Sequence, residues 1–379
     1  MLKGVHLSLL MGPGIPVPVP ELVANSIASI QVTNSKERNG FQIVFNVDKK
    51  SELLKSLLPA GFFDPISTRV MIIATMNGVP NLLMDGFITN QQMSPSGEPG
   101  KSTLTVTGED VSVVMDIVEI IIPFPAMPDI AKIYFLLGQF AFLGLIPIVI
   151  PPPVSTVKVP TDGWDGLFGK THRAFLKKLA SDNGYIFFII PGPLPGGNIA
   201  YFGPDIDINL PIPQPAVSIN MDANTNVESL SFSLNGLAKK IRVFTVYDPT
   251  TKKIPIPIPL PNINIFKPPM GLRLTPPSKL EFAHGGAKLP LDEAAKEILG
   301  FLMNKENSLA VSGNGSLDVV QYNGILRPRM MVGVRGAGIT YDGLYFVDSV
   351  THNIKPGEYK QNFTLSRDGL ISNTPMVPV

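Results

Sequence analysis

The segment Gly166-Leu167-Phe168-Gly169-Lys170-Thr171 is the part of the chain that comes nearest to a phosphate-binding loop. Such a loop holds phosphates with backbone N–H groups, and it needs a glycine five positions before the glycine of its Gly-Lys pair. That position is Trp164, and no strong strand leads directly into the segment. We therefore interpret it as a loop and cap before a helix that begins at Thr171.

Histidines are the next candidates for chemistry, as ligands of a metal ion. The four are His6, His172, His284 and His352. No two lie at a metal-ligand spacing, and no nearby carboxylate completes a ligand set. The chain has no cysteine, which excludes disulfides, thiol nucleophiles, thiolate zinc sites and iron–sulfur clusters. The sequence therefore predicts no metal site.

Two acidic pairs, Glu109-Asp110 and Asp205 with Asp207, have the residue types of a glycosidase acid and nucleophile. Exposed turn carboxylates are far more common, and we interpret both pairs in that way. The Gly-x-Ser-x-Gly elbow of α/β-hydrolases is absent. The sequence predicts no catalytic residue, no cofactor-binding residue, no cofactor and no enzymatic activity.

Composition limits the possible partners. The 379 residues exceed one typical domain, so two or three are expected. Net charge is +1 and 16% of residues are charged, so there is no basic excess for nucleic acid. The low charge indicates that other chains cover much of the surface. Prolines interrupt the apolar N-terminal stretch, and we expect no Sec export signal.

The first 116 residues are predicted to be β-rich. Alternating apolar residues at 41–47 are typical of a half-buried strand. A β-branched run at 69–76, the turn pair Asn77-Gly78 and a second run at 79–84 predict a hairpin. Residues 102–107 predict another strand, with Leu104 and Val106 on one face.

Residues 117–204 have a different pattern, which predicts a helix-containing insertion. Residues 129–145 are apolar and compatible with a helix, and residues 171–182 predict a second helix that ends at Asn183-Gly184. A buried strand is expected at 185–190. The uncharged stretch 133–157 raises a membrane-spanning alternative, but 129–145 spans only about 25 Å against a core of about 30 Å. We therefore expect a helix buried by protein.

The C-terminal part begins with proline-rich sequence. The alternation of isoleucine and proline at 254–261 excludes a central strand, because proline lacks the N–H that a strand ladder needs. We expect an extended edge or crossing segment there. Residues 292–304 predict a helix, and the last 60 residues return to β.

One spacing occurs twice in the chain. Asp85-Gly86 precedes Pro99-Gly100 by the same distance that separates Asp342-Gly343 from Pro356-Gly357, and a strand-like run follows each pair of turns. Each copy therefore predicts turn, strand, turn and strand, and the repeat predicts two related β-domains. Chance recurrence is the alternative, because glycine and proline are abundant.

Three segments resemble those of the baseplate hub proteins of contractile tails. This family includes the late control D group of phages, the N-terminal part of VgrG spike proteins and hubs of contractile injection particles. The segments are 104–110 with Met115-Asp116 after it, 174–185, and 343–352 with its paired strand 359–367. They are short, and together with their surroundings they cover nearly the whole chain.

The resemblance implies a β-rich α+β fold with two related small β-barrels and inserted helix-containing subdomains. We expect a first barrel at 1–116 with return strands at about 205–235, the insertion at 117–204, and a second barrel at 236–379. The second barrel would contain a proline-rich and helical insertion at about 251–307.

The resemblance also implies a structural function. The chain would be a homotrimer that joins a hexameric inner tube to a central spike, with other baseplate components as partners and no nucleic acid. The particle would assemble in the bacterial cytoplasm as a tail-like structure. A membrane-associated or carbohydrate-active β-protein is the alternative.

Overall fold

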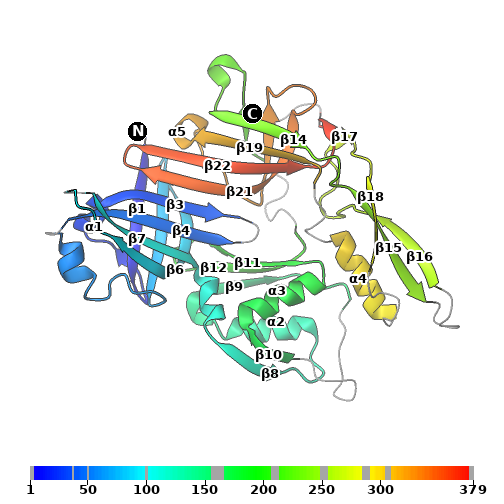
Figure 1. The fold of residues 1–379 in the computed structure, drawn as a ribbon, viewed down its shortest axis with the longest axis horizontal. Coiled ribbons are helices and arrows are strands. Elements are labelled where there is room, and N and C mark those ends of the chain that lie inside the picture. Colours follow the sequence, from blue (N-terminus) through cyan, green and yellow to red (C-terminus); the bar gives the residue numbers. More distant parts are fainter. Residues whose placement is uncertain are drawn as a thin grey trace.

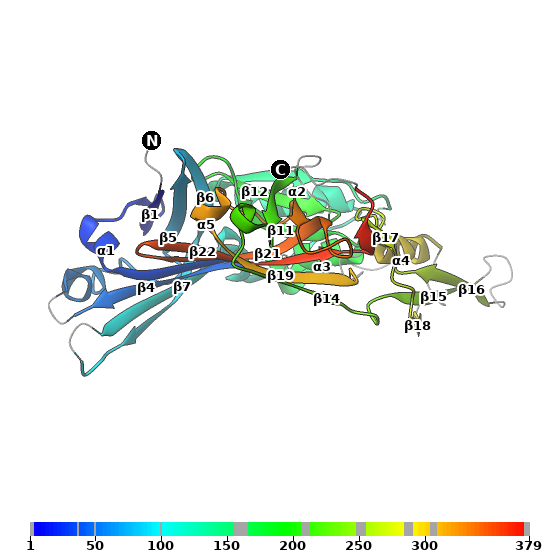
Figure 2. The same ribbon diagram turned by 90° about the horizontal axis from the view of Figure 1, so that it is seen from above.

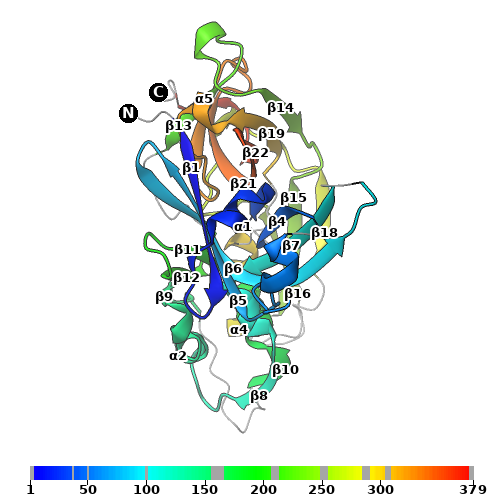
Figure 3. The same cartoon turned by 90° about the vertical axis from the view of Figure 1, so that its left-hand side faces the viewer.

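The computed structural model describes residues 4–35, 38–48, 51–98, 101–154, 166–205, 213–247, 255–283, 291–303 and 309–374. The chain is β-rich, with mostly antiparallel strand pairs and few helices (Figure 1). This confirms the predicted β-rich α+β class. Helices α2 (Asp129–Gly138) and α3 (His172–Asp182) lie at one end of the molecule, together with the strand pair β8 (Glu119–Pro123) and β10 (Gly166–Thr171). Helix α5 (Val319–Tyr322) and strand β14 (Ser229–Leu234) lie at the opposite end (Figures 1 and 3).

A 13-stranded sheet contains strands from both ends of the chain. Its N-terminal strands are β1 (Val5–Pro13), β2 (Val17–Pro18), β3 (Ile27–Asn34), β4 (Asn39–Val47), β5 (Thr68–Met76), β6 (Val79–Ser94) and β7 (Ser102–Asp110). Helix α1 (Glu21–Asn25) and a π-helical turn (Leu53–Leu57) connect some of them. The predicted strands at 41–47, 69–76 and 102–107 and the hairpin turn Asn77-Gly78 are confirmed.

The C-terminal strands of the same sheet are β13 (Gln214–Ser218), β14 (Ser229–Leu234), β19 (Val311–Asp318), β20 (Met331–Arg335), β21 (Gly343–Lys355) and β22 (Glu358–Arg367). Helix α5 (Val319–Tyr322) follows β19, and β23 (Leu370–Ser372) pairs with β17 (Gly271–Arg273). The two halves meet where β3 pairs with β21.

Both halves arrange six strands in the same order. We number β1, β3, β4, β5, β6 and β7 as the first to sixth strands of one half, and β13, β14, β19, β20, β21 and β22 as those of the other. Each half then reads second, third, sixth, fifth, fourth, first across the sheet. The halves differ in the last pair, which is antiparallel for β1 and β5 and parallel for β13 and β20. The duplication predicted from the sequence is thus present in the strand order.

The fifth strand of each half has a register shift at its pairing with the sixth strand. The shift lies between Ile88 and Asn90 in β6 and between Val347 and Ser349 in β21. Aligning the halves at this β-bulge places Gly86 at the position of Tyr345. The expectation that Asp85-Gly86 matches Asp342-Gly343 is therefore wrong by two residues.

The turns predicted by the repeated spacing have mixed outcomes. Asp85-Gly86 lies inside β6 rather than in a turn. Pro356-Gly357 forms the turn between β21 and β22, where Gly357 has a φ of 81°, a conformation that glycine adopts without steric cost. The pair Pro99-Gly100 lies outside the described residues.

The large sheet has an open strand order with β14 and β2 at its ends, and no closed barrel is found among the described strands. The expected return strands at about 205–235 are β13 and β14. They pair with β20 and β19 of the C-terminal half, not with strands of the first region. The expectation that these strands complete the first β-region is therefore wrong. In each half the second strand pairs with the third strand of the same half, as β3 does with β4 and β14 with β19.

In its described residues, the insertion contains two small sheets and two α-helices. The sheets are β8 (Glu119–Pro123) with β10 (Gly166–Thr171), and β9 (Leu145–Val149) with β12 (Asn198–Gly203) and β11 (Ile186–Pro191). Helix α3 (His172–Asp182) confirms the predicted helix, and Asn183 and Gly184 follow its last residue, with a φ of 67° at Gly184. The predicted strand at 185–190 corresponds to β11.

The helix expected at 129–145 is shorter than predicted. Helix α2 (Asp129–Gly138) is followed by a 3-10 turn (Ala141–Leu143) and then by β9. Gly144 reverses the chain with a φ of 74°. A Cβ atom at this position would lie 2.0 Å from the carbonyl oxygen of Gly196, so a side chain would not fit there. The apolar composition of 145–149 therefore serves a strand that pairs with β12.

The C-terminal insertion forms a small sheet that extends from the body (Figures 1 and 2). It consists of β16 (Pro255–Pro261), β15 (Lys240–Tyr247) and β18 (Lys279–Phe282), in that order, with helix α4 (Leu291–Met303) beside it. The proline-rich run is an edge strand, as predicted. Because the prolines occupy alternate positions, their nitrogens, which carry no hydrogen, all point to the same side of the strand. The N–H groups of the residues between them point to the other side and can pair with β15.

Candidate functional site

The residues predicted as a loop and cap form a strand and a cap. Gly166–Thr171 is β10, and the Thr171 hydroxyl accepts a hydrogen bond from the Ala174 backbone N–H at 3.2 Å, which caps α3. The loop part of that interpretation is corrected, and the cap is confirmed. Trp164 lies outside the described residues.

The three described histidines lie on three different elements. His6 is on β1, His172 begins α3, His352 is on β21, and His284 lies outside the described residues. Within the described ranges, no three His, Cys, Asp or Glu side chains are grouped so that they could hold a metal ion. His352 is buried, its Nδ1 is 2.7 Å from the Tyr359 hydroxyl, and burial lowers its pKa to about 3.

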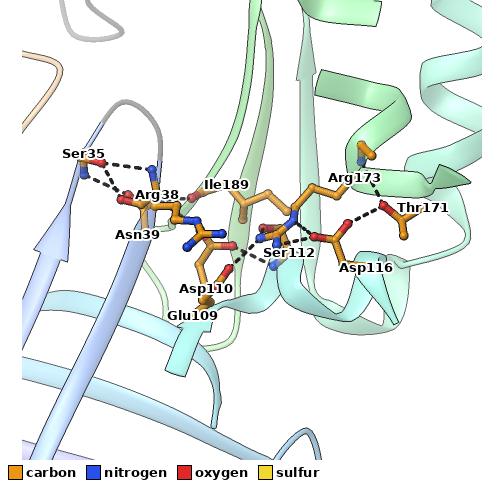
Figure 4. Close-up of polar contacts among 11 residues, drawn as sticks. Ser35, Arg38, Asn39, Glu109, Asp110, Ser112, Asp116, Thr171, Arg173 and Ile189 are labelled. Carbon is orange, nitrogen blue, oxygen red and sulfur yellow. Dashed lines mark hydrogen bonds and ion pairs between the residues drawn. The ribbon is translucent and has the colours of Figure 1, made fainter. Parts of the chain in front are cut away.

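The carboxylates at the end of β7 belong to a polar cluster, which we call the Arg173 cluster, made of Glu109, Asp110, Ser112, Asp116 and Arg173 (Figure 4). The guanidinium donates to both Asp116 and Glu109, the latter at 3.0 Å, and to the Ser112 hydroxyl at 3.1 Å. Thr171 donates to the second oxygen of Asp116. Burial acts to lower the pKa of Arg173, but these hydrogen bonds outweigh it and raise the pKa.

Asp110 is buried rather than exposed in a turn, which corrects the sequence-based interpretation. Its carboxylate accepts from the Ser112 backbone N–H at 2.8 Å and from the Asn39 amide at 3.2 Å. Burial raises its pKa although these donors and Arg173 act to lower it. Asn39 also donates to the Ile189 carbonyl at 2.9 Å, so this contact joins β4, β7 and β11 (Figure 4).

The second acidic pair is only partly described. Asp205 is buried and its carboxylate is 2.8 Å from Nζ of Lys267, which also lies 4.9 Å from the Phe346 ring centre. The expectation of an exposed turn carboxylate is therefore wrong for Asp205. Asp207 lies outside the described residues.

The space beside the Arg173 cluster is small. A cavity of about 20 Å³ is bordered by Arg38, Asp110, Lys177 and Arg329, which is room for about one water molecule. A sugar ring does not fit. The geometry therefore suits a structural tie: two carboxylates are held by one guanidinium, and a third caps a helical turn.

A second polar tie joins the sheet to the insertion. Arg69 on β5 and Asp85 on β6 form two hydrogen bonds of 2.7 Å each, and the Asn198 amide on β12 donates to Asp85 at 2.9 Å. Arg69 also donates to the Leu143 carbonyl at 3.3 Å. All of these side chains are buried.

A third buried cation, Arg329, joins the C-terminal half to the other two parts. It donates to the Ser35 carbonyl at 2.6 Å and its guanidinium lies 3.9 Å from the centre of the Phe188 ring. Burial lowers its pKa to about 10, against the attraction of Asp205 and Asp110. Sequence reasoning missed Arg69, Arg173 and Arg329. Their partners are distant along the chain, so no local signal marks them.

The fold is that of phage tail proteins. A tail protein from Neisseria meningitidis MC58 matches with a TM-score of 0.59 and 13% identity, over 96% of this chain and 97% of that one. The 43 kDa tail protein of prophage MuSo2 from Shewanella oneidensis matches with a TM-score of 0.59 and 12% identity, over 96% and 98%. These identities establish similarity of fold alone.

A chain of a Francisella PdpA–VgrG complex has a similar fold. A chain of the half-lidded Francisella PdpA–VgrG complex matches with a TM-score of 0.58 and 7% identity; the match covers 99% of this chain and 60% of that one. No protein-family model and no curated protein sequence matches the chain. Among the described helices, none has the length and apolar character that crossing a membrane requires.

Proposed function

We propose that this protein is a structural hub of a phage-like tail or contractile injection particle. In this proposal it is a homotrimer that joins a hexameric inner tube to a central spike, and it contacts other baseplate components. The particle would assemble in the bacterial cytoplasm. The two halves would act as two related barrel-like units, each closed by neighbours in the assembly.

The observation that carries the proposal is the shared strand order of the two halves. A tube with six-fold symmetry presents the same surface six times, and a closed ring of copies needs a matching patch at each step. One chain with two similar halves offers two such patches, so three chains offer six. The fold similarity to tail proteins over 96% of the chain supports this assignment.

The proposed function is non-enzymatic. The support comes from the carboxylates that the sequence raised as candidates. Glu109 and Asp116 form ion pairs with Arg173, and Asp205 forms one with Lys267. Asp110 caps a helical turn. Structural polar ties of this kind hold the parts of the chain in fixed relative positions, which a symmetry adaptor requires.

The test is the symmetry and mass of the purified protein, alone and with its tube protein. We expect a trimer by mass photometry and a three-fold ring with six-fold pseudosymmetry by electron cryomicroscopy. A two-fold dimer, a ring of six copies, or a monomer at the concentration of particle assembly would refute the proposal. Separate addition of nucleic acid is a control, and we expect no complex with it.

A further inference from the structure

The junction between the two halves is a strand pair with defined register. The second strand of the first half, β3, pairs antiparallel with the fifth strand of the second half, β21. On one face, Gln31 donates to Asn353 at 3.1 Å, and the hydroxyls of Thr33 and Thr351 are 3.3 Å apart. Polar side chains thus face each other on that face, while Val32 and His352 are buried on the other.

In the opposite halves, β14 corresponds to β3 and β6 corresponds to β21. Within the described part of the chain, both β14 and β6 have an unpaired edge where their counterparts pair with each other. The second strand of the second half, β14, ends the sheet and pairs only with β19 among the described strands. The fifth strand of the first half, β6, pairs with β5 only as far as Phe87. Beyond its bulge, residues 90–94 pair with β7 on one side and with no described strand on the other.

We infer that β14 of one copy pairs antiparallel with residues 90–94 of β6 in a second copy, repeating between chains the junction that β3 and β21 make within one. This inference rests on the proposed trimer. It adds the surface, the partner and the register. Exposed strand edges are templates for pairing with another chain, and here the chain already contains the pattern of the pair.

The register follows from the internal pairings. The pairing of β3 with β4 corresponds to that of β14 with β19, and the pairing of β4 with β7 corresponds to that of β19 with β22. Following these pairings residue by residue makes Gln31 correspond to Ser231. The shared bulge makes Asn353 correspond to Ser94. The internal pair of Gln31 and Asn353 therefore predicts a pair of Ser231 with Ser94 of the second copy. Phe232 then faces Met93.

Side-chain burial agrees with this register. Phe232 and Met93 are each half-buried, while Ser231, Ser233, Gln92 and Ser94 are exposed. The proposed contact thus places apolar side chains on the core face and small polar side chains on the outer face, as the internal junction does. Cross-strand pairs of matching type are the unit of sheet stabilisation.

Backbone geometry also leaves the required groups available. The Asn235 N–H donates to the Ala310 carbonyl at 2.8 Å. Because N–H groups on a strand point alternately to its two sides, those of Ser231 and Ser233 are directed to β19. The N–H groups of Phe232 and Leu234 are then directed to the free edge.

The two edges are far apart on one molecule. In the strand order, six strands lie between β14 and β6 (Figure 2). A contact between them cannot form within one chain, and between chains it is head-to-tail. Such a contact gives a ring when the rotation closes and a filament when it does not.

The absence of cysteine from the chain makes cross-linking a direct test. The variant carries Ser94→Cys and Ser231→Cys. Residues directly opposite on antiparallel strands have Cα atoms about 4.5–5.5 Å apart, within disulfide range. Mild oxidation of the full-length protein is expected to convert most of it into disulfide-linked dimers and trimers on non-reducing gels.

The controls separate the possible contacts. Ser94→Cys and Ser231→Cys proteins made singly are expected to cross-link only after they are mixed and reassembled. A variant with Ser94→Cys and Ser316→Cys, which moves one thiol to the neighbouring strand β19, is expected to remain uncross-linked. Efficient cross-linking of either single variant by itself would indicate a symmetric two-fold contact and would overturn the inference.

Mass photometry of the same samples separates this inference from the proposed function. Trimers without cross-links in the double variant would refute the β14–β6 contact and leave the trimeric hub standing. Monomers throughout would refute both. Cross-linked trimers, together with the silent Ser316→Cys control, would support both.

Discussion

Arg69 and Asp85 form a two-point ion pair inside the protein, with both nitrogen–oxygen distances at 2.7 Å and Asp85 fully buried. Asn198 completes the carboxylate's partners from the insertion. The pair thus connects neighbouring strands of the large sheet and also fixes where the insertion sits. Removing one member leaves a buried charge without its partner, which is more costly than removing both.

We predict that Arg69→Met lowers the free energy of unfolding by about 3–5 kcal/mol. The double variant Arg69→Met with Asp85→Leu should recover part of that loss, because no buried charge remains. Urea unfolding followed by circular dichroism measures both. The matched control is the exposed pair of Lys178 and Asp182, where Lys178→Met should change the stability by less than about 1 kcal/mol. Equal losses in the two single variants would contradict this prediction.

His352 should make stability depend on acid pH. Burial lowers the pKa of His352 to about 3 in the folded chain, whereas an unfolded histidine has a pKa of about 6.5. Between these values the unfolded chain binds a proton that the folded chain does not. The free energy of unfolding therefore falls as the pH drops below about 6.5, by about 1.4 kcal/mol per pH unit.

The variant His352→Asn keeps an oxygen that can accept from the Tyr359 hydroxyl, the contact that Nδ1 makes at 2.7 Å. We expect a shallower loss of stability between pH 6 and pH 4 than in the parent protein. Urea unfolding at each pH gives the two slopes, and a reference at pH 7.5 removes any constant difference. Parallel slopes would show that His352 is not the responsible group.

Local patterns predicted the elements whose signals are local. Alternation gave β4, Asn77-Gly78 gave the β5–β6 turn, and the stop at Asn183-Gly184 ended α3. The end of α2 was not predictable in this way, because residues 145–149 are as apolar as a helix core. Their pairing with the distant β12 decides the outcome.

The polar ties show the same limit. Glu109 and Asp110 were identified as a pair, but their hydrogen bonds are made with Arg173 and Asn39, which are brought in by other elements. The duplication was detectable because turns recur at equal spacing. The match was two residues out because equal spacing between turn dipeptides does not fix which residues of the two strands are equivalent in the sheet; the strand pairing does.

Gly86 should tolerate no side chain, for a reason different from that of a turn. A Cβ atom there would lie 2.0 Å from the carbonyl oxygen of Glu109 on β7. We predict that Gly86→Val destabilises the protein by at least about 1 kcal/mol, measured by urea unfolding, because backbone cannot move away as a flexible side chain can. Gly97, with no atom near its Cβ position, is the control, and Gly97→Ala should be nearly neutral. A neutral Gly86→Val would contradict the close strand packing.

Folding should need neither a divalent metal nor a nucleotide. The described residues hold no group of metal-ligating side chains, and the Gly-Lys-Thr segment is a strand and a helix cap. We expect Tm to be the same with EDTA and with ATP and magnesium. A ligand at about 100 times its Kd contributes about 2.7 kcal/mol, so a shift of more than a few degrees in either direction would argue against this prediction.

Finally, the turns that follow the fifth strand of each half should have the same role in the assembly. These are the exposed segments at 95–98 and at Pro356-Gly357, which follow β6 and β21. In a ring of alternating halves, equivalent turns lie on the same rim. We expect a bulky insertion after Gly97 or after Gly357 to block tube attachment while the subunit stays folded and trimeric. Co-sedimentation with assembled tubes measures attachment, and circular dichroism with mass photometry verifies the fold and the trimer.

An equal insertion after Gly236, which has open space around it and lies outside both turns, is the control. One insertion could instead block attachment to the tube while the other blocks attachment to the spike. In that case the two halves would not be equivalent in the ring, and the symmetry argument would be wrong.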